Sequence, residues 1–295
     1  MDAERLAGWV AQDAAAPSWW PALNTLRLVD GDAVVTLGTG AAERKQIGQQ
    51  LLQIRTRSGG GAVVVSTTEI RTLSAALEDP DVLAGTTEPG QLFTAGGIDP
   101  AGNLIVAMTS PKPRQGGNAC YRLDHGALVQ VAAGFQHVAA VAFTAAGSHA
   151  YVVDSAARRL WQFDADREST IANGRGLVDF SEDAGDPGDV CVDVEGGVWV
   201  AMRGGGQARR YEANGRLSEV ISLPFAGVSG CAFGGPGYDV LYLTLRRGDT
   251  DPEDAGSVYG VRPGVAGAPV PDFDDSTSPP PERLESTAPG ASQAG

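Results

Sequence analysis

Two side chains capable of acid–base chemistry, His137 and Asp189, each stand at the start of an apolar, strand-like segment. A histidine oriented by a carboxylate can act as a general base, so the pair predicts proton-transfer chemistry if both face one site. Other interpretations stay open. His137 can be a partly exposed loop residue, and Asp189 can be a displaced metal ligand or cap the backbone amides of a turn beside Pro187 and Gly188.

Comparable positions before or within other apolar segments are candidates for substrate contacts. Thr94 and Ser229 offer hydroxyl groups there, whereas Leu92 and Ala139 offer apolar surface. Neither hydroxyl belongs to a motif that activates a nucleophile, because the chain has no G-x-S-x-G elbow in a strand–turn–helix context. These four residues are therefore predicted to bind a substrate without attacking it.

The elements that must position these side chains recur along the sequence. A unit of apolar strand, glycine turn and second apolar strand is found at residues 96–108, 138–154, 189–202 and 230–245. Its turn glycines are Gly102, Gly147, Gly196 and Gly237. They lie 45, 49 and 41 residues apart, which is the period of a four-stranded propeller blade. The innermost strand of each blade opens at a central channel, so the candidate residues are expected to face that channel.

Four such blades occupy about residues 90–264, and strand-like segments at 23–38, 49–57 and 62–68 leave room for two more. The sequence therefore predicts an all-β, six-bladed propeller over residues 1–273. The N-terminal segment is expected to be a short extension, with a short helix over the propeller as one possibility. Residues 274–295 are rich in Pro and Ser and contain no aromatic residue, which predicts a disordered tail.

Composition excludes several kinds of partner. The acidic chain has 22 basic and 36 acidic side chains, a formal net charge of −14, which argues against nucleic acid and anionic membrane surfaces. No apolar run reaches the roughly 18 residues of a membrane span, and the first residues do not resemble a signal peptide. A propeller leaves only short protected strand edges, so we expect a monomer.

The cysteines suggest a compartment. Cys120, Cys191 and Cys231 are odd in number and lack a C-x-x-C spacing, which argues against a disulfide framework and a thiolate zinc site. Cys191 and Cys231 alternate with apolar residues and are expected to be packing thiols. We therefore expect a reducing, cytoplasmic location.

The second half of the chain resembles a known family. The segments SHAYVVDSAARRLWQFDAD, EGGVWVAMRGGG and SGCAFGGPGYDVLYLTL, within Phe143–Phe273, are similar to the SMP-30/gluconolactonase/luciferin-regenerating-enzyme family. The resemblance implies a six-bladed propeller that holds a divalent metal such as Ca, Mg or Zn in its channel, on one Glu, one Asn and one Asp. Such a metal would act as a Lewis acid on a lactone carbonyl.

The residues that the resemblance implies are mostly absent. The three metal-ligand positions fall on Ala15, Ala139 and Gly188, with Asp189 one place after the last of them. The family's substrate-binding R-x-N-D-G segment falls on residues 92–96, where Leu and Thr replace the Arg and the Asn. Ala and Gly have no side-chain donor, so the sequence predicts that the family's metal site is not retained.

Three functions follow as hypotheses. The first is a lactonase-like hydrolase, or a related catalyst, acting on a small molecule in the channel. The second is a metal-independent binding protein or catalyst of specialised metabolism, and the third is a pseudoenzyme that serves as an interaction module. A channel mouth that brings Asp189 together with another carboxylate would favour the hydrolase. An apolar channel lined by residues such as Leu92, Val138 and Ala139 would favour the metal-independent binding protein or catalyst. A channel filled by side chains would favour the pseudoenzyme.

Overall fold

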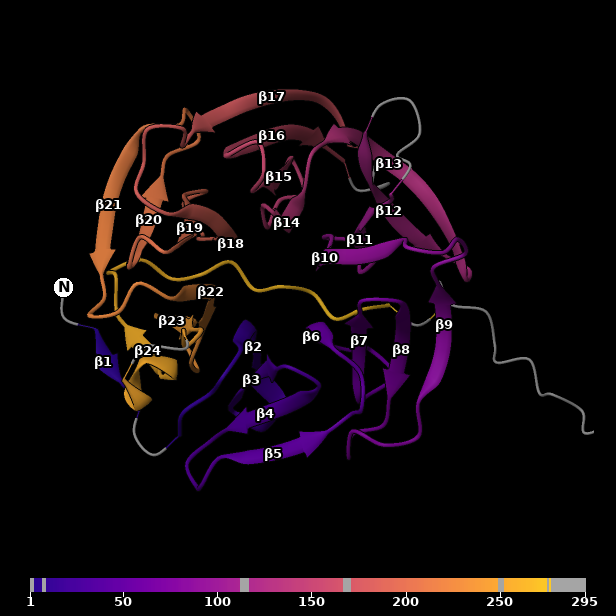
Figure 1. Ribbon diagram of the computed structural model, residues 1–295, viewed down its shortest axis with the longest axis horizontal. Helices are drawn as coiled ribbons and strands as arrows, with labels where there is room; N and C mark the ends of the chain where they lie inside the picture. The colour runs from indigo at the N-terminus through magenta and orange to yellow at the C-terminus, as the bar shows by residue number, and fades with distance from the viewer. Residues whose placement is uncertain are drawn as a thin grey trace, which may run out of the picture.

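The computed structural model describes residues 3–6, 9–111, 117–166, 171–248, 252–274 and 276. These residues form six antiparallel four-stranded sheets, arranged as the blades of a propeller around a common axis (Figure 1). In the first five blades the strands follow one another in sequence from the axis outward. The prediction of an all-β six-bladed propeller is confirmed.

The strand bounds of the first three blades are as follows. The first blade holds β2 (Ala14–Trp20), β3 (Thr25–Asp30), β4 (Ala33–Leu37) and β5 (Glu43–Gln46). The second holds β6 (Leu51–Thr56), β7 (Ala62–Ser66), β8 (Glu69–Leu73) and β9 (Asp81–Gly85). The third holds β10 (Leu92–Ile98), β11 (Leu104–Thr109), β12 (Asn118–Asp124) and β13 (Ala127–Phe135).

The remaining blades complete the ring. The fourth holds β14 (Val138–Phe143), β15 (His149–Asp154), β16 (Arg159–Ala165) and β17 (Ile171–Asp179). The fifth holds β18 (Asp186–Val192), β19 (Val198–Arg203), β20 (Gln207–Tyr211) and β21 (Leu217–Ser222). The sixth holds β22 (Val228–Gly234), β23 (Val240–Leu245), β24 (Val258–Val261) and β1 (Glu4–Arg5).

Burial explains why the second strand of a blade is apolar at successive positions. In β7, Val63, Val64 and Val65 are all buried, because side chains on opposite faces of the strand pack against different neighbours. Val64 belongs to the core cluster shared with the first blade, and Val63 and Val65 to the cluster shared with the third. A strand buried on both faces has no polar side, which distinguishes it from the alternating outer strands.

The turns between the first two strands of a blade use glycine where the backbone requires a positive φ. Gly102, Gly147 and Gly196 have φ values of 87°, 72° and 82°, as their predicted turn positions demand. In the sixth blade Gly237 lies within the turn, as predicted, but the positive φ values belong to its neighbours Gly235 (85°) and Tyr238 (53°). Tyr238 occupies the position of the turn glycine of the other blades, because its N–H bonds to the carbonyl oxygen three residues earlier, that of Gly235.

The N-terminal segment closes the ring, and the short helix considered for it is absent from the described residues. Glu4 and Arg5 pair with Gly260 and Tyr259 of β24, so the start of the chain supplies the outermost strand of the last blade (Figure 1). Residues 14–20 then form the innermost strand of the first blade. The closure therefore joins the two ends of the sequence.

The C-terminal segment crosses one end of the propeller axis. After β24 the chain runs over the centre of the ring toward the second and third blades (Figure 1). Ala268 donates its backbone N–H to Val192, and the Phe273 N–H bonds to Thr56 at 2.9 Å. The Phe273 side chain is fully buried. The predicted disordered tail, apart from residues 274 and 276, lies outside the described residues.

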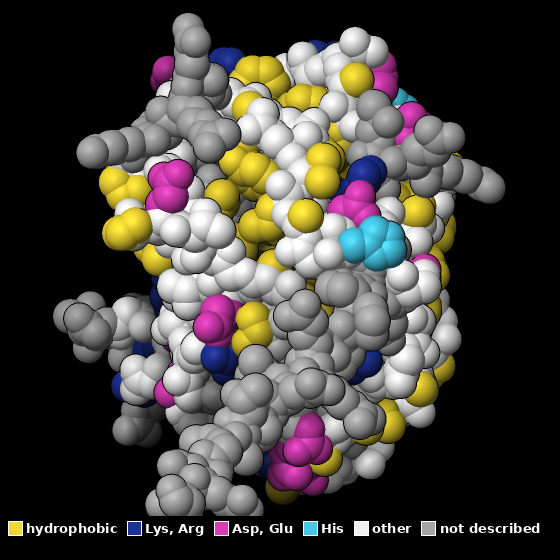
Figure 2. All heavy atoms as spheres, turned by 90° about the vertical axis from the view of Figure 1, so that its right-hand side faces the viewer, with side chains coloured by type: hydrophobic (Ala, Val, Ile, Leu, Met, Phe, Trp, Pro, Cys, Tyr) yellow, Lys and Arg dark blue, Asp and Glu magenta, His cyan; other side chains and the backbone are white. Residues whose placement is uncertain are grey.

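The outer surface is mixed in character. On the face drawn in Figure 2, apolar side chains are interspersed with polar ones, and acidic and basic side chains lie next to each other. In the described part of the chain, no helix has the length and apolar character needed to cross a membrane.

Candidate functional site

A β-bulge interrupts the innermost strand of every blade near the same end of the channel. The bulges lie at Ala15/Ser18, Leu51/Gln53, Phe93/Ala95, Val138/Ala140, Pro187/Val190 and Val228/Gly230. A bulge leaves a residue out of the ladder and redirects its side chain. One such residue from each blade lines a common cavity: Ala16, Leu52, Thr94, Ala139, Asp189 and Ser229.

This channel cavity has a volume of about 130 Å³ and is charged. Its charged lining residues are Asp13, Arg55, Asp189, Arg203 and Arg246. Three guanidinium groups thus face two carboxylates, in a protein whose formal net charge is −14. The apolar lining considered from the sequence is wrong for this cavity, because Val138 is buried in the core and Leu92 lies outside the lining at 43% exposed.

Asp189 is held in place by backbone donors on both oxygens. Its Oδ1 accepts the N–H of Val190 at 2.9 Å, and its Oδ2 accepts the N–H of Cys231, on the sixth blade, at 3.1 Å. Burial raises the pKa of the Asp189 carboxyl, and this effect is opposed first by the charge of Arg55. Each oxygen keeps a second lone pair, so the carboxylate remains able to accept a proton from the cavity.

Arg55 lies between the two ends of the channel, since it lines both the channel cavity and a second cavity beyond it. Its Nη1 donates to the Ile54 carbonyl at 2.9 Å. Burial lowers the pKa of Arg55, and the nearby Asp189 charge opposes that shift. An arginine stays protonated even so, which places a permanent cation beside the carboxylate.

Arg203 lies over a glycine on the neighbouring strand. A Cβ atom built on Gly188 would be 3.5 Å from Nη2 of Arg203 and 3.8 Å from its Nε. Among the described residues, no hydrogen bond or ion pair engages the side chain of Arg203. Burial, followed by the positive charge of Arg246, lowers the pKa of Arg203, while the charges of three nearby carboxylates, those of Asp186, Asp189 and Asp13, oppose this shift. The guanidinium therefore faces the cavity without a hydrogen-bonded partner among the described residues.

Arg246 and Asp13 form an ion pair at the channel mouth. Arg246 Nε contacts Asp13 Oδ1, and the two residues also form an isolated β-bridge between the sixth and first blades. The backbone N–H of Asp13 donates to Asp30 Oδ1 at 2.8 Å. Asp13 thus joins Asp189 as the second carboxylate of the cavity, which is the arrangement that favours the first hypothesis from the sequence.

Two buried donors in the cavity have no partner among the described residues. Nε2 of Gln53 and Oγ1 of Thr94 are both buried without a hydrogen bond. Gln53 is only 2% exposed, and its Nε2 is 2.3 Å from the position that a Cβ atom on Gly96 would occupy. The glycine makes room for the amide. Buried polar groups normally find partners, so donors left open in a cavity point to a ligand.

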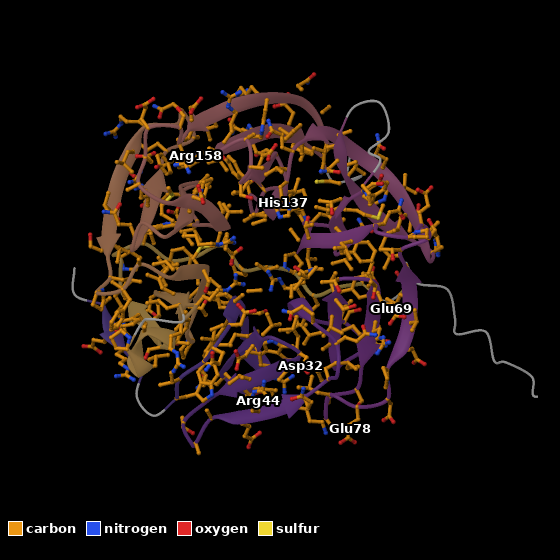
Figure 3. All side chains as sticks on the ribbon, in the orientation of Figure 1. Asp32, Arg44, Glu69, Glu78, His137 and Arg158 are labelled. Carbon is orange, nitrogen blue, oxygen red and sulfur yellow. The ribbon has the colours of Figure 1, made fainter. Side chains whose placement is uncertain are left out.

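Ser229 and His137 are placed differently from Asp189. The Ser229 hydroxyl lies within hydrogen-bonding distance of the carbonyl oxygens of Ala14 and Thr244, the latter at 3.1 Å, so the fold already engages it. Figure 3 shows His137 on the channel side of the fourth blade, but it is not among the residues that line the cavity. The structure therefore brings Thr94, Ala139, Asp189 and Ser229 together and leaves Leu92 and His137 outside that lining.

His137 is close to Arg203 rather than paired with Asp189. Its backbone N–H donates to Asp154 Oδ1 at 2.9 Å. Partial burial and the positive charge of Arg203 lower the pKa of the His137 imidazole, while Asp154 opposes the shift. A neutral imidazole at neutral pH follows, without an orienting carboxylate from Asp189.

The residues at the three implied metal positions do not fit a divalent cation. Ala15 and Ala139 line the channel cavity without a ligating atom in their side chains, and Gly188 has no side chain. A cation placed there would face the guanidinium groups of Arg55 and Arg203. Over the ranges that the structure describes, no group of three or more His, Cys, Asp and Glu could hold a metal ion.

The second cavity, at the other end of the channel, is mostly apolar. It has a volume of about 330 Å³, is lined by Phe143, Cys191 and Cys231 among others, and is closed by residues 268–271 of the C-terminal segment. The three cysteines form no disulfide, and Cys120 and Cys231 are buried. Burial raises the pKa of the Cys120 thiol to about 12, as expected of a packing thiol.

The arginines of the channel cavity were missed from the sequence, although Arg203 and Arg246 carry a recognisable signal. Arg203 ends the second strand of the fifth blade, and Arg246 directly follows that of the sixth. The corresponding strands of the first and fourth blades end in Asp30 and Asp154, whose carboxylates accept backbone N–H groups of the incoming inner strand. The fifth and sixth blades thus carry an arginine at, or one residue after, the end of the second strand, where the first and fourth blades carry an aspartate.

These features define a six-bladed propeller with a polar cavity at one end of its channel. Within that class, the chain belongs to the SMP-30/gluconolactonase/LRE family, because the family model described as "SMP-30/Gluconolactonase/LRE-like region" matches residues 16–247. The resemblance found in the sequence is thereby confirmed.

Individual relatives agree with this assignment. Regucalcin of Oryctolagus cuniculus is 28% identical over 281 residues, which cover 86% of this chain and 92% of that protein. A calcium-binding protein, regucalcin, from Agrobacterium tumefaciens has the same fold, with a TM-score of 0.82 at 19% identity over 92% of this chain and 97% of that one. A gluconolactonase of Xanthomonas campestris has the same fold, with a TM-score of 0.71 at 19% identity over 86% of each chain.

Proposed function

We propose that the protein is a hydrolase that opens a lactone or related small ester in the channel cavity without a divalent metal. The observation that carries the proposal is Asp189, a carboxylate fixed by two backbone N–H groups, which faces a cavity that also holds Arg55. Membership of the family supports a lactonase-like reaction, as does the likeness to a protein described as a gluconolactonase.

The cavity residues supply the groups that hydrolysis of an ester requires. Asp189 takes a proton from a water molecule as the water oxygen attacks the ester carbonyl carbon. Arg55, with the open donors of Gln53 and Thr94, stabilises the negative charge that develops on the carbonyl oxygen. The bond from the carbonyl carbon to the ring oxygen then breaks, and the ring oxygen receives the proton from Asp189, giving a hydroxy acid.

The test is hydrolysis of a panel of small lactones by protein treated with a chelator. We expect turnover to persist after chelation and Asp189→Asn to lower kcat by about 10²–10⁴-fold, the usual size of general acid–base catalysis. Asp179→Asn is the matched control, because Asp179 pairs with Arg159 on the outer strand of the fourth blade. Loss of turnover on chelation, or full activity of Asp189→Asn, would overturn the proposal.

The second candidate is a binding protein without turnover, favoured by the unpartnered donors of the cavity. The same panel of lactones distinguishes a hydrolase from a binding protein. A lactone that binds and is recovered unchanged would show that the protein binds it without turnover. As parts of the proposal we also expect a monomer acting in the cytoplasm. The three cysteines without disulfides support a reducing compartment.

A further inference from the structure

The charge of the channel cavity is opposite in sign to that of the chain. Three arginines face it with two carboxylates, and one of the arginines, Arg246, is already paired with Asp13. The negative charge that acts on Arg55 is that of Asp189, which opposes the lowering of the Arg55 pKa by burial. The remaining guanidinium is that of Arg203, so the surplus positive charge of the cavity belongs to this residue.

The carboxylates near Arg203 are engaged elsewhere. Asp186, opposite it in the β18–β19 register, forms an ion pair with Arg158. Asp189 accepts two hydrogen bonds, both from backbone N–H groups rather than from Arg203. Arg203 is exposed at the end of β19 and lies near a second arginine, Arg246. A bound anion would offset the repulsion between these two positive charges and would supply acceptors for the Arg203 guanidinium.

We propose that Arg203 anchors an oxyanion group, a carboxylate or a phosphate, of the small molecule that occupies the channel cavity. A guanidinium can donate two parallel hydrogen bonds to such a group. Arg246 adds positive potential beside it, and the open amide of Gln53 offers a further donor within the same cavity. The ligand class is thus a small organic anion, in contrast to the neutral lactone of a sugar.

The position of Arg203 in the cavity determines how a bound ligand would be oriented. Arg203 comes from the end of the second strand and lies against Gly188, whereas Arg55 reaches the far side of the cavity. A ligand anchored on Arg203 would extend past Asp189 toward Arg55. Insofar as it identifies this anion as the substrate, the inference rests on the proposed function, but anion binding is measurable without turnover.

The binding arm of the test is calorimetry at low chloride with inorganic phosphate and with malonate as probes. We expect one site for at least one probe, with affinity that falls as salt is added and falls about tenfold or more in Arg203→Gln. Arg203→Lys should retain part of the affinity. Arg216→Gln is the matched control, because Arg216 is exposed and paired with Glu212 on the outer part of the fifth blade. Tighter binding of malonate would identify the anionic group of the ligand as a carboxylate, and tighter binding of phosphate would identify it as a phosphate.

The turnover arm compares a neutral lactone with the same ring carrying a carboxylate. We expect a lower KM for the anionic lactone, and Arg203→Gln should raise that KM about tenfold or more and by a larger factor than the KM of the neutral lactone. Asp189→Asn should lower kcat by about 10²–10⁴-fold and still bind malonate or phosphate, because it removes the general base and a negative charge from the cavity.

The outcomes separate the two proposals. If no lactone is hydrolysed but a probe binds and Arg203→Gln loses it, the hydrolase is wrong and the anion site stands. If both lactones are hydrolysed equally well and Arg203→Gln changes neither binding nor KM, the anion site is wrong and the hydrolase stands. Binding that Arg216→Gln weakens as much as Arg203→Gln would also overturn the site, because the attraction would then be general.

Discussion

Nη2 of Arg203 lies 3.5 Å from the point where a side chain on Gly188 would begin. The sequence aligns position 188 with a metal-binding Asp of the family, so a cationic side chain lies where the family implies an anionic ligand of a metal. Ala15 and Ala139, at the other two implied positions, line the same cavity without a donor. The cavity therefore presents a guanidinium group beside a position where the resemblance implies a metal ligand.

A carboxylate introduced at position 188 should neutralise that centre. In Gly188→Asp the new side chain would reach Arg203 and pair with it, so we expect the affinity for malonate or phosphate to fall as far as in Arg203→Gln. Gly188→Ala is the control, because both variants place a Cβ atom 3.3 Å from the Ala201 carbonyl oxygen but only one adds charge. Calorimetry measures the affinity of the wild type, Gly188→Asp and Gly188→Ala for malonate and phosphate. Equal affinities for Gly188→Asp and Gly188→Ala would show that Arg203 does not hold the anion.

His137 should titrate below the ordinary range of a histidine. Partial burial and Arg203 both lower the pKa of its imidazole, so the neutral form predominates at pH 7. Removing the positive charge in Arg203→Gln should raise the pKa, because protonation of His137 no longer meets that repulsion. A proton NMR titration measures it, with His137→Asn assigning the signal among the three histidines. A pKa above 6.5 in the wild type, or no rise in Arg203→Gln, would contradict the placement of the two residues.

The C-terminal segment should contribute strongly to stability through Phe273. Its ring is fully buried in the core cluster of the second and third blades. Phe273→Ala should lower the free energy of unfolding by about 3–5 kcal/mol, the usual cost of removing a buried aromatic ring. Val270, in the same segment, is 55% exposed, so Val270→Ala should change the free energy by less than about 0.5 kcal/mol. Urea denaturation of the two variants measures this difference. Similar unfolding midpoints for Phe273→Ala and Val270→Ala would refute a packing role for the segment.

Much of the fold follows from local sequence, because each blade is built from strands close together in the chain. Glycines such as Gly102 and Gly147 occupy turns that need a positive φ, and their spacing gives the blade period. The closing strand could not be predicted in the same way. Glu4 and Arg5 pair with residues about as far away in sequence as the chain allows, and a two-residue strand has no periodicity to read.

Part of the cavity lining could be predicted from the sequence. Four of the predicted residues lie among the first four positions of the innermost strands, where a bulge turns each of them toward one cavity: Thr94, Ala139, Asp189 and Ser229. The presence of Arg55 in the same cavity as Asp189 was not predictable, because Arg55 comes from a different blade and strand alternation does not say which side chain reaches the axis. Contacts between blades depend on three-dimensional closure rather than on local pattern.

The most direct test of a channel that uses guanidinium groups in place of a metal is calorimetry on chelator-stripped protein, titrated in parallel with malonate, phosphate and calcium. We predict one-site binding of malonate or phosphate that Arg203→Gln weakens, and no one-to-one binding of calcium. Tight one-to-one binding of calcium, together with no binding of either anion, would contradict the account and return the channel to a metal site.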